Sequence, residues 1–187
     1  MNKIITSKEE ILAESKKIVA QKGLQAINMR EVAKNCNVAV GSVYNYFPSK
    51  NDLLVSIIES VWKEIIQGIS RNTKKQTFAE DVENIFYNIK NAGEKYPFFF
   101  GLHSVILDKN GRDKGRETMN SYFESIKSDL LFSLQRDENI NENFFSSKCT
   151  QEDFIEFVFS NLLTLLIQNR QSCNVLTEII KSAVYKI

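Results

Sequence analysis

The sequence predicts an all-α protein in which a small N-terminal head of three helices precedes a larger helical body. Two observations support this prediction. Apolar residues recur at helical spacing in one segment after another, and helix-capping residues bound these segments. No stretch shows the sustained apolar–polar alternation of a half-buried strand. The chain has 187 residues, 43% of them hydrophobic, with 7 Gly and 2 Pro. It is therefore long enough to bury a core and too poor in Gly and Pro for a linker protein.

Three short helices are predicted within the first 50 residues. Ser7 opens a capping box for the first helix, and Gly23 ends it. Asn28 caps a shorter second helix, and a break of about three residues separates it from a third helix at about 40–47. This layout is typical of a helix-turn-helix. We therefore expect a DNA-binding domain at residues 1–50, followed by a separate helical domain at residues 51–187.

The body is predicted to be helical throughout. An apolar stripe from Leu53 to Ile69 spans about 17 residues, or about 25 Å of helix. The charged stretch 108–114 is predicted to be a loop. The other expected landmarks are Thr77 at the start of the next helix, a break at Pro97, a helix at about 116–136, Thr150 as a cap and Asn174 at the start of the last helix.

Charge is divided unequally between the two parts. Residues 1–50 contain eight Lys or Arg against four Asp or Glu, and residues 51–187 contain sixteen against nineteen. The head is thus basic and the body slightly acidic, although the whole chain carries only +1. A basic head favours contact with a polyanion, and the alternative is an ordinary solvated surface.

Cysteine content and hydropathy indicate the cellular compartment in which the protein is expected. The three cysteines, Cys36, Cys149 and Cys173, are odd in number and widely spaced, which matches neither a disulfide framework nor a zinc site. No run approaches the roughly 18 apolar residues of a membrane helix, and the N-terminus does not resemble a signal peptide. We expect a cytoplasmic protein with no metal or other cofactor.

The third predicted helix has an unusual outer face. Val43 and Phe47, one turn apart, are expected to pack into the head. The residues left outside are Gly41, Ser42, Tyr44, Asn45 and Tyr46. Hydroxyl groups donate to phosphates, Asn reads base edges, and Gly lets a backbone approach closely. The alternative is that the tyrosines merely cover the core of the head.

Residues 23–34 (GLQAINMREVAK) and 38–54 (VAVGSVYNYFPSKNDLL) closely resemble the DNA-binding head of TetR-type bacterial transcriptional regulators. The resemblance covers about residues 8–56. It implies a homodimer whose recognition helices enter successive major grooves of a palindromic operator. It also implies that the protein is most often a repressor, and that a small molecule bound in the body releases the DNA.

The resemblance also implies roles for individual residues. Gly41, Ser42 and Tyr44 stand at base-contacting positions, Asn45, Tyr46 and Lys50 at phosphate-contacting positions, and Asn28 at the cap of the second helix, where it touches the DNA backbone. The chain departs from the family pattern at Ala39 and Val40, which replace a hydroxyl and a common Lys or Pro. Val40 is instead suited to contact a thymine methyl group.

The body supplies candidate effector and dimer residues. Its aromatic residues suggest a pocket for an apolar or aromatic effector, the alternative being an ordinary core. The pocket candidates are Phe86, Phe99, His103, Tyr122, Phe123 and Phe157. The two C-terminal helices are apolar enough to need cover from a second chain, the alternative being that their apolar residues fill the chain's own core. The dimer candidates are Phe159, Leu162, Leu163, Leu166, Leu176, Ile180 and Val184.

Other classes of function have less support from the sequence. The sequence has no phosphate-binding loop, no dinucleotide-binding turn and no HExxH, and its single histidine makes a catalytic triad implausible. We therefore expect no catalytic residues and no enzyme activity. The remaining alternative is a helical interaction module of the same fold that has lost specific DNA binding.

Overall fold

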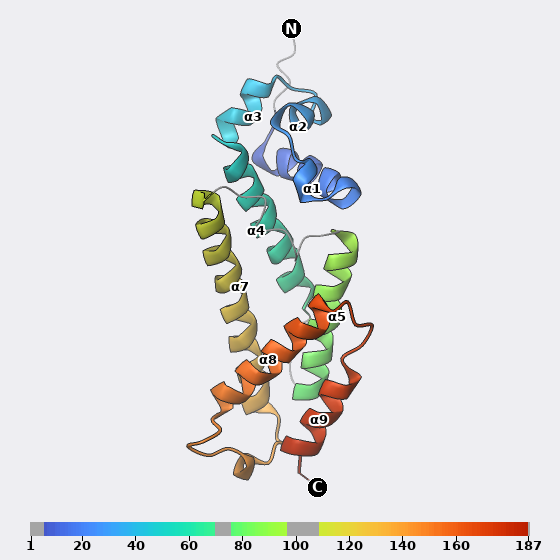
Figure 1. The fold of residues 1–187 in the computed structure, drawn as a ribbon, viewed down its shortest axis with the longest axis vertical. Helices are drawn as coiled ribbons and strands as arrows, with labels where there is room; N and C mark the ends of the chain where they lie inside the picture. Colours follow the sequence, from blue (N-terminus) through green and yellow to red (C-terminus); the bar gives the residue numbers. More distant parts are fainter. Residues whose placement is uncertain (1–5, 70–75, 97–108, 187) are drawn as a thin grey trace. The chain divides into compact units, whose positions relative to one another are not determined.

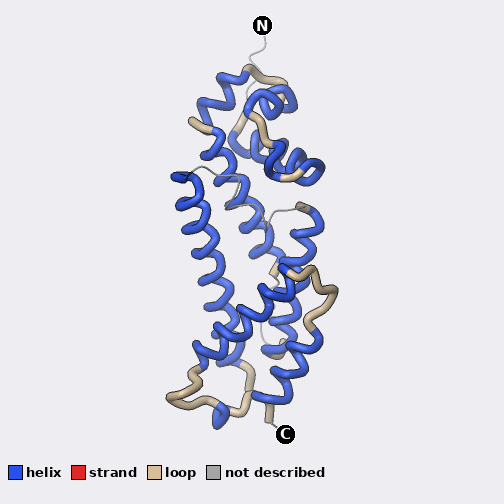
Figure 2. The backbone as a smooth tube through the Cα atoms, in the orientation of Figure 1, coloured by secondary structure: helices blue, strands red, loops and turns tan. Residues whose placement is uncertain are grey.

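The computed structural model describes residues 6–69, 76–96 and 109–186, and nearly all of the regular structure in these ranges is helical (Figure 2). No strand occurs in the described ranges, where two isolated bridges pair Ile140 with Tyr185 and Ser146 with Cys149. The all-α prediction is confirmed. The helices in chain order are α1 (Lys8–Lys22), η1 (Leu24–Ala26), α2 (Met29–Asn35), α3 (Val40–Tyr46), α4 (Lys50–Gly68), α5 (Phe78–Lys95), α7 (Lys109–Arg136), η2 (Glu142–Phe144), α8 (Gln151–Ile167) and α9 (Asn174–Val184).

Packing divides the chain into two compact units. The first contains the described residues up to Glu64 and those of 92–120, and the second contains those of 65–91 and 121–187. Within the described ranges, no helix is both long enough and apolar enough to cross a membrane.

The first unit contains the head. Figure 1 shows α1, α2 and α3 gathered at the N-terminal end of α4. The capping box of α1 forms as expected, with the Ser7 hydroxyl accepting from the Glu10 N–H at 3.1 Å. Apolar side chains from all four helices are buried together, namely Ile11, Ile18, Val19, Val32, Val43, Phe47, Leu53, Leu54, Ile57, Ile58, Val61 and Trp62.

Glu64 connects three helices of this unit. Its carboxylate on α4 accepts from Lys16 Nζ of α1 at 3.3 Å, from the Tyr96 hydroxyl just after α5 at 2.9 Å, and from Lys95 Nζ of α5. Partial burial alone would raise the pKa of Glu64, but these three donors outweigh it and hold the pKa below its ordinary value. The carboxylate is therefore charged at neutral pH and joins α1 to the end of α5.

The second unit is built from α8, α9 and parts of α5 and α7. Thr150 and Asp153 form the expected capping box of α8, and Thr77 caps α5. The buried side chains include Phe78, Val82, Ile85, Phe86, Ile89, Ile126, Leu130, Leu134, Phe154, Ile155, Val158, Phe159, Leu162, Leu176, Ile180 and Val184.

Asp137 joins both ends of this unit. Its Oδ2 accepts from the Phe78 N–H at 2.9 Å and from the Tyr185 hydroxyl at 2.8 Å, and its Oδ1 accepts from the Asn139 N–H at 3.1 Å. Burial would raise the pKa of Asp137, but the hydrogen bonds outweigh it and lower that pKa. The Tyr185 hydroxyl in turn accepts from the Ala79 N–H at 3.0 Å. The carboxylate thus ties the C-terminal segment to the start of α5.

The boundary of α7 differs from the prediction. The helix begins at Lys109 and runs for 28 residues, so the expected loop at 108–114 is wrong from residue 109 onward. Lys and Arg are good helix formers, and the single glycine in this stretch, Gly111, costs only about 1 kcal/mol, which a long helix tolerates. The expected break at Pro97 lies outside the described residues.

We predict that Asp137→Asn lowers the free energy of unfolding by about 1–3 kcal/mol at pH 7, because the neutral amide replaces a charged acceptor of several hydrogen bonds. The folded-state pKa of Asp137 is depressed, so its stabilisation is complete above about pH 4 and is lost as the pH falls through the folded-state pKa. Urea unfolding at pH 7 and pH 3 measures this. A difference between variant and wild type that is equally large at both pH values contradicts the assignment.

Candidate nucleic-acid interface

The turn between α2 and α3 places the two helices against each other. Asn28 caps α2, its Oδ1 accepting from the Arg30 N–H at 2.9 Å. After α2 the chain turns at Asn37, whose φ of 55° lies in the left-handed region that Asn tolerates better than most residues. The Val38 N–H then donates to the Ala33 carbonyl at 2.9 Å. Ala33 is buried, and its small side chain allows close packing in the helix-turn-helix.

The helix α3 has one buried side and one exposed side. Val43 is fully buried, and Phe47, at the cap that follows the helix, is 1% exposed. Val40 and Tyr44, one turn apart, are 38% and 47% exposed, and Asn45 is exposed as well. Ser42 is half-buried. The structure therefore brings the predicted base-contacting residues to the surface of one helix.

Gly41 is not required by the packing of the chain. It is exposed in the first turn of α3, and a Cβ atom at this position would meet nothing within 4 Å. Its backbone is helical, so an alanine would fit and would favour the helix by up to about 1 kcal/mol. The absence of a side chain here thus points to something outside the chain that approaches the helix closely.

Six basic residues of the head fall into two groups. Three lysines of α1 form ion pairs with carboxylates of the same chain: Lys16 pairs with Glu64 at 3.3 Å, Lys17 with Glu14 at 2.6 Å and Lys22 with Glu31 at 2.7 Å.

The second group lies on α2 and at the start of α4. Arg30, Lys34 and Lys50 are exposed, and the structure shows no ion pair for them with any described residue. Lys50 is a sequence-predicted site residue. Arg30 and Lys34 were not predicted, although they are one turn apart on α2 and contribute to the basic charge of the head. These cations leave positive potential on the helices next to α3.

Tyr46 differs from its expected role. Its hydroxyl donates to the Thr6 carbonyl at 2.7 Å, so its proton is used inside the head and is not available for a phosphate. The ring is 42% exposed. The hydrogen bond holds the segment before α1 against the end of α3.

The predicted effector residues lie in different environments. Phe86 is fully buried, Tyr122 and Phe123 are half-buried, and Phe157 is 52% exposed on α8. The Phe123 ring packs edge-on against Phe159 with centroids 5.2 Å apart. Phe99 and His103 lie outside the described residues.

The predicted dimer residues mostly face the interior of their own unit. Phe159, Leu162, Leu176, Ile180 and Val184 are each 6% exposed or less, so they fill the core of their own unit. Leu163 and Leu166 are half-buried. Both sides of α8 and α9 are apolar, and in each helix one apolar side packs against the core of the unit.

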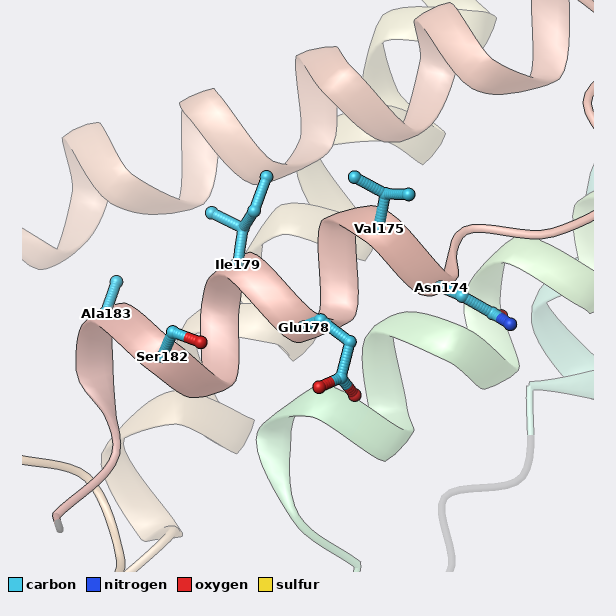
Figure 3. A pocket seen from close by; sticks show the side chains of 6 residues that line it. All are labelled: Asn174, Val175, Glu178, Ile179, Ser182 and Ala183. Atoms are coloured by element: carbon cyan, nitrogen blue, oxygen red, sulfur yellow. The ribbon is translucent and has the colours of Figure 1, made fainter.

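The exposed side of α9 is also apolar. Val175 and Ile179 are 76% and 53% exposed, and on α8 Ile167 is 79% exposed. Figure 3 shows Val175, Ile179 and Ala183 along one side of α9. They belong to a shallow surface pocket whose lining residues are Asn174, Val175, Glu178, Ile179, Ser182 and Ala183.

Cys36 and Cys173 do not have the environment of reactive thiols. Burial, together with Glu14 and Glu10, raises the pKa of Cys36. Burial and Glu83 raise the pKa of Cys173 to about 11. A raised pKa suppresses the nucleophilic thiolate, so these two positions are poor candidates for redox sensing.

Comparison with known proteins now identifies the head. Residues 7–57, which hold α1, α2, α3 and the start of α4, match the family described as bacterial regulatory proteins of the tetR family. The head of this chain is therefore similar to the N-terminal part of TetR-family regulators. Members of this family are transcriptional regulators and not enzymes, in agreement with the prediction of no enzyme activity.

Individual TetR-like proteins resemble larger parts of the chain. The transcriptional repressor KstR of Rhodococcus jostii is 33% identical over 90 residues, 48% of this chain and 42% of KstR. The chain thus matches less than half of that relative's length. The regulator FadR of Bacillus subtilis, solved with stearoyl-CoA, is 16% identical with a TM-score of 0.66, over 96% of this chain and 100% of FadR. BioQ, solved with its double-stranded DNA operator, is 15% identical with a TM-score of 0.61, over 95% and 97%. These two structures share the fold.

We predict that Gly41→Ala leaves the stability of the protein unchanged or raises it by up to about 1 kcal/mol, because the position is helical and open. The same variant should weaken DNA binding at least tenfold, because a methyl group would separate α3 from the duplex. Thermal unfolding and fluorescence anisotropy on a selected DNA site measure the two effects. Unchanged affinity would show that nothing approaches Gly41 closely.

Proposed function

We propose that this protein is a DNA-binding transcriptional regulator that inserts α3 into the major groove of an operator. The observation that carries the proposal is the exposed surface of α3. Val40, Gly41 and Tyr44 are exposed there, and no described residue lies within 4 Å of where a Cβ atom at position 41 would stand. A surface of this kind, on the second helix of a helix-turn-helix, suits contact with base edges. The match of residues 7–57 to the TetR family supports the same function.

We assign base contacts and phosphate contacts to residues of the head by their charge and position. Val40, Gly41, Ser42 and Tyr44 face the bases, and Asn45 faces a phosphate. Arg30, Lys34 and Lys50 neutralise phosphates on either side, because they are exposed and have no acidic partner among the described residues. Such contacts set register and affinity, whereas the α3 side chains set sequence preference. Asn28 Oδ1 accepts a hydrogen bond in the cap of α2, so the side-chain NH₂ group of Asn28 is the part that would donate to a phosphate.

We also propose that the protein acts as a homodimer on a palindromic site. An isologous interface on α8 and α9 would cover the exposed apolar residues Val175, Ile179 and Ile167, with Leu163 and Leu166 beside them. The residues of these helices that fill the core are left out of this interface. Two heads related by a twofold axis would then bind the two half-sites of the operator.

The effector is proposed to be a small apolar or aromatic molecule bound in the body. Half-buried Tyr122 and Phe123 and buried Phe86 are the described residues that could line its site. FadR, which shares the fold, was solved with stearoyl-CoA, and KstR is a repressor. We propose a repressor located in the cytoplasm, with residues 1–50 binding DNA and residues 51–187 serving effector binding and dimerisation.

We predict that Lys50→Ala weakens binding to all DNA sequences about equally and reduces the slope of log affinity against log salt by about one. Tyr44→Ala should instead change the preferred sequence as well as the affinity. In vitro selection from random duplexes, followed by anisotropy titrations at several salt concentrations, measures both. Lys17→Ala is the matched control, because Lys17 is already paired with Glu14 and should have little effect. If the wild-type protein selects no duplex at low salt, the proposal fails and a helical interaction module becomes the better explanation.

We predict that Ile179→Glu converts a dimer into monomers, because the isologous interface would place the new charge in an apolar contact. Sedimentation equilibrium measures the change. Val40→Glu, also at an exposed apolar residue but in the head, is the control and should remain dimeric. Wild-type protein that is monomeric at tens of micromolar, or an Ile179→Glu variant that stays dimeric, rules out this interface.

A further inference from the structure

The first turn of α3 offers a duplex almost no polar side chain. Its N-cap is Ala39, and no side chain caps the helix. Val40 follows with 38% of its surface exposed, and Gly41 has open space where a side chain would stand. The other head helices begin with polar caps, since Ser7 caps α1 and Asn28 caps α2. The start of α3 is therefore apolar where the same chain elsewhere uses hydrogen-bonding residues.

The fold does not explain the choice of valine at position 40. A β-branched residue is a weaker helix former than alanine, and an exposed isopropyl group gains little from burial. The core beneath α3 is filled by Val43 and Phe47, which are 0% and 1% exposed. Val40 is thus not one of the fully buried core residues, and the 38% of its surface that stays exposed is apolar and faces outward.

The chemistry of the major groove restricts what such a surface can recognise. Guanine shows two acceptors there, cytosine a donor, and adenine a donor and an acceptor. An aliphatic side chain against any of these removes water from a polar group and returns no hydrogen bond. Thymine alone adds a methyl group, which gains from apolar contact.

We propose that Val40 reads the methyl group of a thymine in each operator half-site. The inference rests on the proposed DNA-binding function and names the base that this function selects. Tyr44, one turn along the same row of α3 and 47% exposed, extends the apolar surface next to the methyl group. Position 40 is thus a specificity-determining residue, and the preferred half-site contains an A·T pair whose thymine faces the start of α3.

The experiment uses the full-length protein and a duplex obtained by in vitro selection. Each thymine of the half-site is replaced in turn by uracil, which removes only the methyl group. Wild-type protein should lose about three- to fivefold in affinity per half-site at one position, the amount expected for one buried methyl group. Val40→Ala should lower affinity for the thymine duplex and show almost no discrimination between thymine and uracil at that position.

Lys34→Ala is the matched control. It should weaken binding but keep the full thymine-to-uracil ratio, so that loss of affinity is not mistaken for loss of methyl recognition. Circular dichroism and thermal unfolding confirm that the variants are folded, as expected for exposed positions.

The outcomes separate this inference from the proposed function. Failure of wild-type protein to select any duplex overturns both. Selection of a sequence whose uracil substitutions all bind equally well overturns methyl recognition and leaves DNA binding intact. A uracil effect that persists in Val40→Ala assigns the methyl contact to a different residue and also overturns the inference.

Discussion

The burial of Val43 and Phe47 is the constraint on which the proposed function depends. Both side chains are almost completely buried in the head, and they fix the rotation of α3 about its own axis. With that rotation fixed, Val40, Gly41 and Tyr44 must face outward. A different rotation would bury the tyrosine and expose the phenylalanine, and the same seven-residue helix would present no surface suited to a duplex.

Local features of the fold were predictable because neighbouring residues determine them. The capping boxes at Ser7 and Thr150 and the exposed side of α3 all depend on spacings of three or four residues. The start of α7 was missed because a run of charged residues with a glycine reads as a loop, although its lysines and arginine favour a helix. The side of α9 that meets the core could not be predicted, because both of its sides are apolar.

Contacts between distant residues account for the rest of what sequence reasoning missed. Lys16 and Glu64 are 48 positions apart, and Tyr46 and Thr6 are 40 apart. The first contact removes a cation from the surface of the head, and the second removes a donor from the candidate interface. Which basic residues remain unpaired, and so which ones can meet phosphates, depends on such pairings. Arg30 and Lys34 therefore emerged as candidates only from the structure.

The bond from Tyr46 to the Thr6 carbonyl also has a practical side. It holds Thr6, just before α1, next to the end of α3. A label or a bulky substitution at Thr6 would therefore act beside the surface assigned to the duplex.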